Sequence, residues 1–221
     1  MAATRHRGRK SSMRWILWGV IILAVSVAIA WGFRSNTSMR LFDRLPLRNN
    51  DIVLLGDSHF EYFDAAEMLN DKRIRNRGIS GQTSAEMLRR MDEVERAGPR
   101  MVLLLAGAND AFQKRGTEAY LRDMEQLIAR AKAAAKGVAV LSIPPTTDRE
   151  FQPELDRYNA VLTRLCERLD VTYIDLRPAL EKDGLLDPAL TYDGLHLNTD
   201  GYRRIVPLIK PFLKAPDRTG P

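Results

Sequence analysis

Short apolar runs alternate with stretches of helical spacing along most of the chain. The runs 101–106 and 138–143 contain no charged residue, and a continuous apolar run of that length is typical of a strand buried on both faces of a parallel sheet. Between such runs, apolar residues recur three and four positions apart, as Met87, Met91 and Val94 do, which predicts helices. The pattern predicts strands at 52–55, 73–76, 101–106, 138–143 and 171–175.

The intervening segments predict a fold with helices on both faces of the sheet. Gly137 is expected to stop the third helix, and Pro207 and Pro211 to kink or shorten the last one. Right-handed crossovers between parallel strands then give an α/β protein, a three-layer α/β/α sandwich with a five-stranded parallel sheet. Sites in such folds form at the carboxyl ends of the strands. The helices are predicted at 60–69, 84–97, 117–135, 153–169 and 199–213.

The segment 15–33 interrupts this alternation with nineteen residues that carry no charge. At 1.5 Å per residue, such a helix spans about 28 Å, enough for a bilayer core. Tryptophans near its ends and basic residues before it predict a signal anchor with a cytoplasmic N-terminus and an extracytoplasmic domain, periplasmic in a Gram-negative bacterium. The alternative is a signal peptide cleaved after Ala30, where Ala28-Ile29-Ala30 resembles a processing site, which would make the protein secreted.

The basic charge of the chain is concentrated in this N-terminal part. The net charge is +6, and residues 1–34 contain six basic residues and no acidic one. From residue 35 onward, 28 basic residues therefore balance 28 acidic ones, which removes the main argument for nucleic-acid binding. We divide the chain into a basic N-terminus, a transmembrane helix, a linker, a globular domain and a flexible tail, at 1–14, 15–33, 34–50, 51–213 and 214–221.

Polar residues that can carry nucleophilic chemistry follow the first strand and recur near the end of the domain. Ser58 stands in a sharp turn after 52–55, and Asp193 and His196 are three residues apart. A serine, a histidine base and an orienting carboxylate together activate a hydroxyl for acyl transfer. His59 adjoins Ser58, but consecutive side chains diverge at such a turn, so His196 is the predicted base. Each segment taken alone also fits an ordinary turn, cap or surface pair.

Two further loops offer hydrogen-bond donors for an oxyanion. The amide of Asn109 follows the third predicted strand, and the backbone N–H of Gly78 follows the second. No metal and no cofactor is predicted, because the chain has no His/Cys cluster to supply further ligands. Cys166 is the single cysteine; it lies in a helical pattern and is predicted to be a small buried hydrophobe.

These loops together resemble the four sequence blocks of the SGNH (GDSL-type) hydrolase family. The blocks are Gly56-Asp57-Ser58, Gly78, Gly107-x-Asn109-Asp110 and Asp193-x-x-His196, and 76–81 is similar to the branch of platelet-activating-factor acetylhydrolase subunits and bacterial acyl esterases. The resemblance covers about 51–213. It implies a flavodoxin-like fold, metal-independent ester hydrolysis, a triad of Ser58, Asp193 and His196, and an oxyanion hole of the Ser58 and Gly78 N–H groups with the Asn109 amide.

Two positions depart from the family pattern. His59 stands where an apolar residue is common, and we expect it to pack at the turn rather than join the site. Gln82 stands where relatives commonly carry aspartate, which should alter hydrogen bonding in the loop but leave the nucleophile intact.

The expected function is therefore a membrane-anchored serine esterase that hydrolyses short-chain acyl esters. An O-acetyl esterase or acetyltransferase acting on envelope polysaccharide, and a lysophospholipase, use the same site and stay open as alternatives. A non-catalytic binding protein on the same fold is a further alternative, which the intact site residues disfavour. The expected partners are a small acyl ester, lipid or acetylated glycan and, through the N-terminal helix, a membrane.

Overall fold

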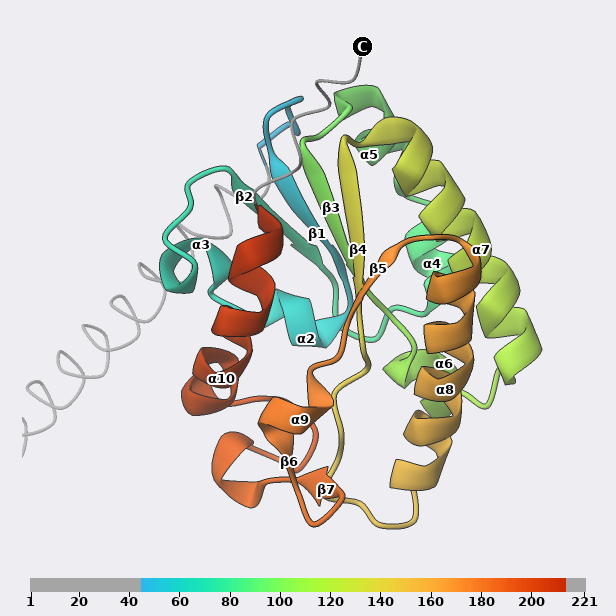
Figure 1. The fold of residues 1–221 in the computed structure, drawn as a ribbon, viewed down its shortest axis with the longest axis vertical. Helices are drawn as coiled ribbons and strands as arrows, with labels where there is room; N and C mark the ends of the chain where they lie inside the picture. Colours follow the sequence, from blue (N-terminus) through green and yellow to red (C-terminus); the bar gives the residue numbers. More distant parts are fainter. Residues whose placement is uncertain (1–44, 214–221) are drawn as a thin grey trace, which may run out of the picture. The chain divides into compact units, whose positions relative to one another are not determined.

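A five-stranded parallel sheet forms the centre of the computed structural model, which describes residues 45–213 (Figure 1). The strand order β2-β1-β3-β4-β5 is the flavodoxin-like order, and the sheet confirms the predicted three-layer α/β/α architecture. Each predicted strand is present, with bounds shifted by one or two residues. The strands are β1 (Ile52–Gly56), β2 (Ile74–Gly78), β3 (Met101–Leu105), β4 (Gly137–Leu141) and β5 (Thr172–Ile174).

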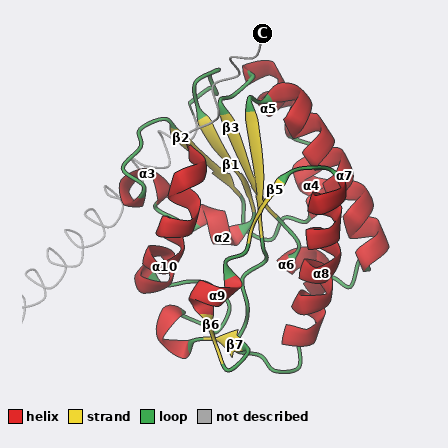
Figure 2. Cartoon of the chain, viewed as in Figure 1, coloured by secondary structure: helices red, strands yellow, loops and turns green. Residues whose placement is uncertain are grey.

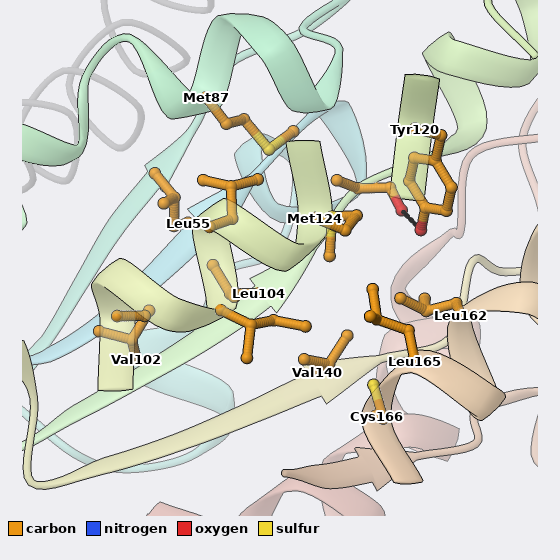
Figure 3. Packing of buried hydrophobic residues seen from close by; sticks show 14 of the residues in the cluster. Leu55, Met87, Val102, Leu104, Tyr120, Met124, Val140, Leu162, Leu165 and Cys166 are labelled. Carbon is orange, nitrogen blue, oxygen red and sulfur yellow. Dashed lines mark hydrogen bonds between the residues drawn. The ribbon is translucent and has the colours of Figure 1, made fainter. Parts of the chain in front are cut away.

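Helices cover both faces of the sheet because side chains alternate along each strand (Figure 2). Val53 and Leu55 of β1 point to one face, where α4 (Ser84–Leu88), α5 (Met91–Ala97), α6 (Ala108–Phe112), α7 (Thr117–Ala134) and α8 (Gln152–Arg168) pack. Figure 3 shows this core, which includes Tyr120 of α7. The Tyr120 hydroxyl donates a hydrogen bond of 2.9 Å to the main-chain carbonyl of Ala106. The hydroxyl of this buried tyrosine is therefore paired.

The opposite face is covered by shorter elements. Ile52 and Leu54 of β1 pack there against helices α2 (Ser58–Glu61), α3 (Ala65–Met68), α9 (Arg177–Leu180) and α10 (Thr199–Ile209). A 3₁₀ turn η1 (Pro188–Leu190) and a two-residue ribbon of β6 (Glu181–Lys182) and β7 (Leu185–Leu186) lie between α9 and α10, and the sequence pattern did not predict them. Strands of two residues are too short for a periodic signal.

Two segments that were predicted as single helices each form two short helices in the structure. The segment 60–69 is divided between α2 and α3, and the amide of Asn76 donates to the main-chain carbonyls of Phe60 and Phe63 at the break. The segment 84–97 is divided between α4 and α5 at Arg90, whose backbone is not helical (φ −113°, ψ 16°). In both cases a side chain bonds a carbonyl across the fold, and such a contact leaves no mark in the periodicity.

Helix ends also differ from the sequence prediction. Helix α7 ends at Ala134, and the backbone is already extended at Ala135, so Gly137 opens β4 instead of stopping the helix. Helix α10 contains Pro207 and then tightens into the 3₁₀ turn η2 (Lys210–Leu213), which confirms the predicted shortening.

Within residues 45–213, no helix combines the length and the apolar character that a membrane crossing needs. The predicted span at 15–33 lies outside the described residues, as do the basic N-terminus 1–14, most of the linker and the tail 214–221.

Candidate active site

Ser58 is placed at the carboxyl edge of the sheet by the turn between β1 and α2. Asp57 caps α2, and its Oδ1 accepts a 3.0 Å hydrogen bond from the N–H of His59. This cap ends the strand and starts the helix within one residue, so the chain reverses sharply at Ser58. The side chain of Ser58 therefore stands at the strand end, where the sequence pattern predicts it.

Ser58, His196 and Asp193 form one hydrogen-bonded row, although 138 positions separate the first two. The Ser58 Oγ lies 2.9 Å from Nε2 of His196, and Nδ1 of His196 lies 2.7 Å from Oδ2 of Asp193. An ionised Asp193 accepts only, so His196 carries its proton on Nδ1 and offers the Nε2 lone pair to Ser58. The geometry brings together the three residues that the sequence predicted as a triad.

Asp193 is held in its charged form. Partial burial raises the pKa of its carboxyl, but hydrogen bonds from the His196 ring and from the N–H groups of His196 and Leu195 together lower it to about 2. The two backbone bonds, of 2.8 and 3.0 Å, both go to Oδ1 and leave Oδ2 to the imidazole. The carboxylate thus orients the ring and can stabilise the imidazolium.

The loop that carries Asp193 and His196 is hydrogen-bonded to the loop that follows β4. The carbonyl of Gly194 accepts hydrogen bonds from Thr147 N–H (2.8 Å) and from Thr146 Oγ1 (2.9 Å). Thr191 Oγ1 donates 2.7 Å to the His196 carbonyl and accepts from the Gly194 N–H. These threonines hold the loop of His196 in place, and the sequence pattern did not reveal them because isolated threonines in loops carry no periodic signal.

The N–H of Gly78, which was predicted to bind an oxyanion, has a hydrogen-bond partner within the protein. Its N–H donates 2.9 Å to Oδ1 of Asn76 and is therefore already paired. Its lack of a side chain has another cause: a Cβ there would lie 2.2 Å from the Glu61 nitrogen and 2.8 Å from the Asp57 carbonyl. Gly78 lets β2 approach the turn that carries Ser58.

Asn109 lies in α6, after β3, at the same edge of the sheet. Its Nδ2 donates 3.0 Å to the main-chain carbonyl of Gln82. An amide nitrogen carries two hydrogens, so a second N–H remains to bind an oxyanion. This bond also places the loop of Gly81, a glycine with φ +77° and open space around it, beside Asn109.

His59 is buried against His196. It is 2% exposed, its ring centroid lies 5.6 Å from that of His196, and neither ring nitrogen has a hydrogen-bond partner among residues 45–213. Burial, and next the neighbouring His196, lower the pKa of His59 to about 3, so the ring is neutral. The burial matches the packing role that the sequence predicts for it.

Exposed aromatic rings occur at the end of α2 and in α6, the helices that carry Ser58 and Asn109. Tyr62 is half exposed, and its ring centroid lies 5.0 Å from that of His196. Phe112 follows Asn109 in α6, is 74% exposed and meets Phe151 edge to face at 6.2 Å. Such single exposed rings have no periodic signature, and the sequence pattern did not single them out.

Cys166 is 1% exposed, and burial raises the pKa of its thiol to about 12, which confirms the predicted buried hydrophobe. Among residues 45–213, no three metal-binding side chains gather into a group that can hold an ion.

Comparison with known proteins gives a match to a family model, similar curated sequences and similar solved structures. Residues 54–204 match the model of the GDSL-like Lipase/Acylhydrolase family. The N-acylneuraminate cytidylyltransferase of Escherichia coli O18:K1:H7 is 33% identical over 181 residues, which cover 76% of this chain and 41% of that protein. The chain thus spans about two fifths of the length of the curated relatives that it matches.

Solved structures share the fold over most of the chain. A GDSL-like lipase from Bacteroides thetaiotaomicron superposes on this chain with a TM-score of 0.67 at 24% sequence identity. The superposition covers 74% of this chain and 87% of the lipase chain. An acetylxylan esterase from Geobacillus stearothermophilus superposes with a TM-score of 0.63 at 17% sequence identity. That superposition covers 76% of this chain and 96% of the esterase chain. At these identities the likeness is one of fold.

Proposed function

We propose that this chain, which belongs to the GDSL-like lipase/acylhydrolase family of SGNH hydrolases, is an ester-hydrolysing enzyme with Ser58 as nucleophile, His196 as base and Asp193 as orienting acid. The observation that carries the proposal is the continuous row from Asp193 Oδ2 through both ring nitrogens of His196 to Ser58 Oγ, with both contacts under 3 Å.

In the proposed cycle, Nε2 of His196 takes the proton of Ser58 as Oγ attacks the ester carbonyl. The imidazolium is stabilised by Asp193 and then gives its proton to the departing alcohol. Water, deprotonated by the same imidazole, attacks the acyl-enzyme and releases the acid. The proton returns to Ser58 Oγ, and the free enzyme is restored.

We propose that the Asn109 amide and the Ser58 N–H bind the oxyanion of the tetrahedral intermediate. Gly78 was predicted as a third donor, and its N–H can act only if Asn76 releases it. The N–H of Gly81, for which the described residues offer no partner, is a further donor candidate in the same loop. Each lost oxyanion donor is expected to lower turnover by about 10²–10³.

The mechanism predicts that Ser58→Ala abolishes hydrolysis of p-nitrophenyl acetate and labelling by a fluorophosphonate probe. Asn109→Ala should keep KM within about threefold and lower kcat by about 10²-fold. Cys166→Ala, which removes the one thiol, is the matched control and should keep both signals. Turnover by Ser58→Ala at the wild-type rate would refute the assignment.

The favoured substrates are short-chain acyl esters, and a second candidate is an O-acetylated sugar in hydrolysis or acetyl transfer. The exposed Tyr62 ring beside His196 supports the sugar, because aromatic faces pack against sugar rings. The names of two similar proteins, an acetylxylan esterase and an N-acylneuraminate cytidylyltransferase, also refer to acylated sugars. Relative kcat/KM values for acetylated xylo-oligosaccharide, O-acetylated N-acylneuraminate, lysophospholipid and p-nitrophenyl acetate distinguish the candidates, and acetyl transfer appears as acetylated acceptor instead of free acetate.

We also propose that residues 15–33 anchor the enzyme in a membrane with the catalytic domain on the extracytoplasmic side. The support is the sequence pattern alone: nineteen uncharged residues, tryptophans near the ends and a basic stretch before them.

A further inference from the structure

A partly buried arginine joins the segments that carry the site. Arg90 stands at the break between α4 and α5, and its guanidinium donates three hydrogen bonds. Two go to main-chain carbonyls at the strand ends, to Arg77 at 2.7 Å and to Gly56 at 3.3 Å. The third goes to the side-chain oxygen of Gln82 at 2.7 Å.

Each acceptor belongs to a different part of the site. Gly56 ends β1 two residues before Ser58, and Arg77 immediately precedes Gly78 in β2. Gln82 lies in the loop after β2, and its main-chain carbonyl accepts the 3.0 Å bond from Asn109. A chain of contacts therefore runs from Asn109 through Gln82 and Arg90 to the strand that ends two residues before Ser58.

The charge of Arg90 strengthens these bonds. Burial lowers its pKa to about 10, so the guanidinium is still charged at neutral pH. Within residues 45–213 it forms no ion pair with a carboxylate, and the nearby Glu93 pairs with Arg77 at 2.9 Å. A charged donor on neutral acceptors gives stronger hydrogen bonds than a neutral donor does.

We propose that Arg90 and Gln82 are positioning residues that hold the Asn109 amide in register with Ser58. This proposal rests on the proposed function, since it assigns the pair an effect on the oxyanion site. A displacement of about 1 Å at a reacting group can cost on the order of 10²-fold in rate, which sets the expected size of the effect.

Gln82 allows the role to be tested without removing a buried arginine. Gln82→Ala removes the bond to Arg90 but keeps the main-chain carbonyl that Asn109 uses. In the full-length protein we expect kcat for p-nitrophenyl acetate to fall about 10–100-fold, with KM within about threefold. Gln82→Glu keeps an oxygen acceptor for Arg90 and should recover most of that turnover. Arg89→Ala, at an exposed neighbouring arginine, is the matched control and should leave kcat unchanged.

A double-mutant cycle with Asn109 identifies the route of the effect. If Gln82 acts by placing Asn109, Gln82→Ala should lower kcat by less than about threefold in an Asn109→Ala background. An equal loss in both backgrounds, unchanged kcat in Gln82→Ala, or no recovery in Gln82→Glu would overturn the proposal. Loss of the proposed function itself would appear separately, as hydrolysis that survives in Ser58→Ala.

Discussion

Asp57, directly before Ser58, is a fully buried carboxyl group. Burial raises its pKa to about 7; the hydrogen bond from His59 N–H opposes this shift, and nearby Asp110 adds to it. The folded protein therefore binds more protons at this position than the unfolded chain does between about pH 4 and 7. The stability that this group contributes is fully present below that window and is lost as the pH rises through it.

Asp57→Asn should consequently become more stable relative to wild type as the pH rises from 4 to 7, with a constant gap above about pH 8. Asparagine keeps the acceptor for His59 N–H but carries no charge. The gap should reach on the order of 2–4 kcal/mol, the equivalent of two to three pKa units. Urea unfolding of both proteins at several pH values measures it. Asp187→Asn, at the cap of the 3₁₀ turn η1, is the control, and a gap for Asp57→Asn that does not vary with pH would contradict the prediction.

His59 acts in the opposite direction in the same experiment. Its lowered pKa of about 3 means that the folded state binds fewer protons than the unfolded one up to about pH 6.5, so its contribution to stability grows with pH there. This contribution is shared by wild type and Asp57→Asn and cancels in their difference. The comparison between the two proteins therefore isolates Asp57.

At the scale of elements, the contact between β2 and α2 depends on Gly78. All three atoms nearest to a Cβ at this position belong to the main chain, which cannot rotate away. Gly78→Ala should therefore lower the free energy of unfolding by about 3 kcal/mol, near the upper end for overpacking. Urea unfolding measures the change.

Gly184→Ala is the matched control for Gly78→Ala, because Gly184 has φ +77° and no atom lies within 4 Å of the place that its Cβ would take. It should cost only the backbone contribution of about 1–2 kcal/mol. A loss at Gly78 no larger than that at Gly184 would show that α2 and β2 separate easily, and that the turn carrying Ser58 is less rigid than the packing indicates.

Elements that depend on the residue pattern within one segment were predictable from the sequence. Features that depend on contacts between distant segments were not. The apolar runs at β1, β3 and β4 predict buried strands because a parallel sheet covered on both faces has no polar side. The breaks in the helices depend on Asn76 and Arg90 bonding carbonyls far along the chain. Periodicity within one segment contains no record of such partners.

The same distinction applies to the site. Ser58 and Asn109 follow strands, and strand ends of a parallel sheet share an edge, so their proximity could be predicted. The hydrogen bond from the Gly78 N–H to the Asn76 side chain was not predicted. Both residues lie in the same predicted strand segment, and its pattern does not show that the Asn76 side chain turns back toward the main chain. The ring of Tyr62 beside His196 likewise depends on how α2 meets a loop far away in sequence.

At the scale of the whole molecule, the proposed membrane anchor and the proposed triad lie in separate parts of the sequence. The excess positive charge and the long uncharged stretch both lie within residues 1–34, whereas the row of Ser58, His196 and Asp193 lies within the matched region 54–204. Residues 35–221 carry equal numbers of basic and acidic residues, so electrostatic attraction to anionic lipid is expected only from the N-terminal part. Changes in that part should move the enzyme between fractions without altering its site.

We therefore expect the full chain to sediment with membranes and to resist extraction by alkaline carbonate. The double variant Leu23→Arg/Val27→Arg places two charges in the centre of the uncharged stretch, at about 2.5–3.5 kcal/mol each, and should release the protein into the soluble fraction. Ser11→Arg/Ser12→Arg adds the same charge before the stretch and should stay with the membranes. Because residues 35–221 are unchanged, kcat/KM for p-nitrophenyl acetate should agree within about twofold among all three proteins. Membrane retention of the Leu23→Arg/Val27→Arg variant would assign attachment to another part of the chain, and a loss of activity on release would show that the membrane supports the site itself.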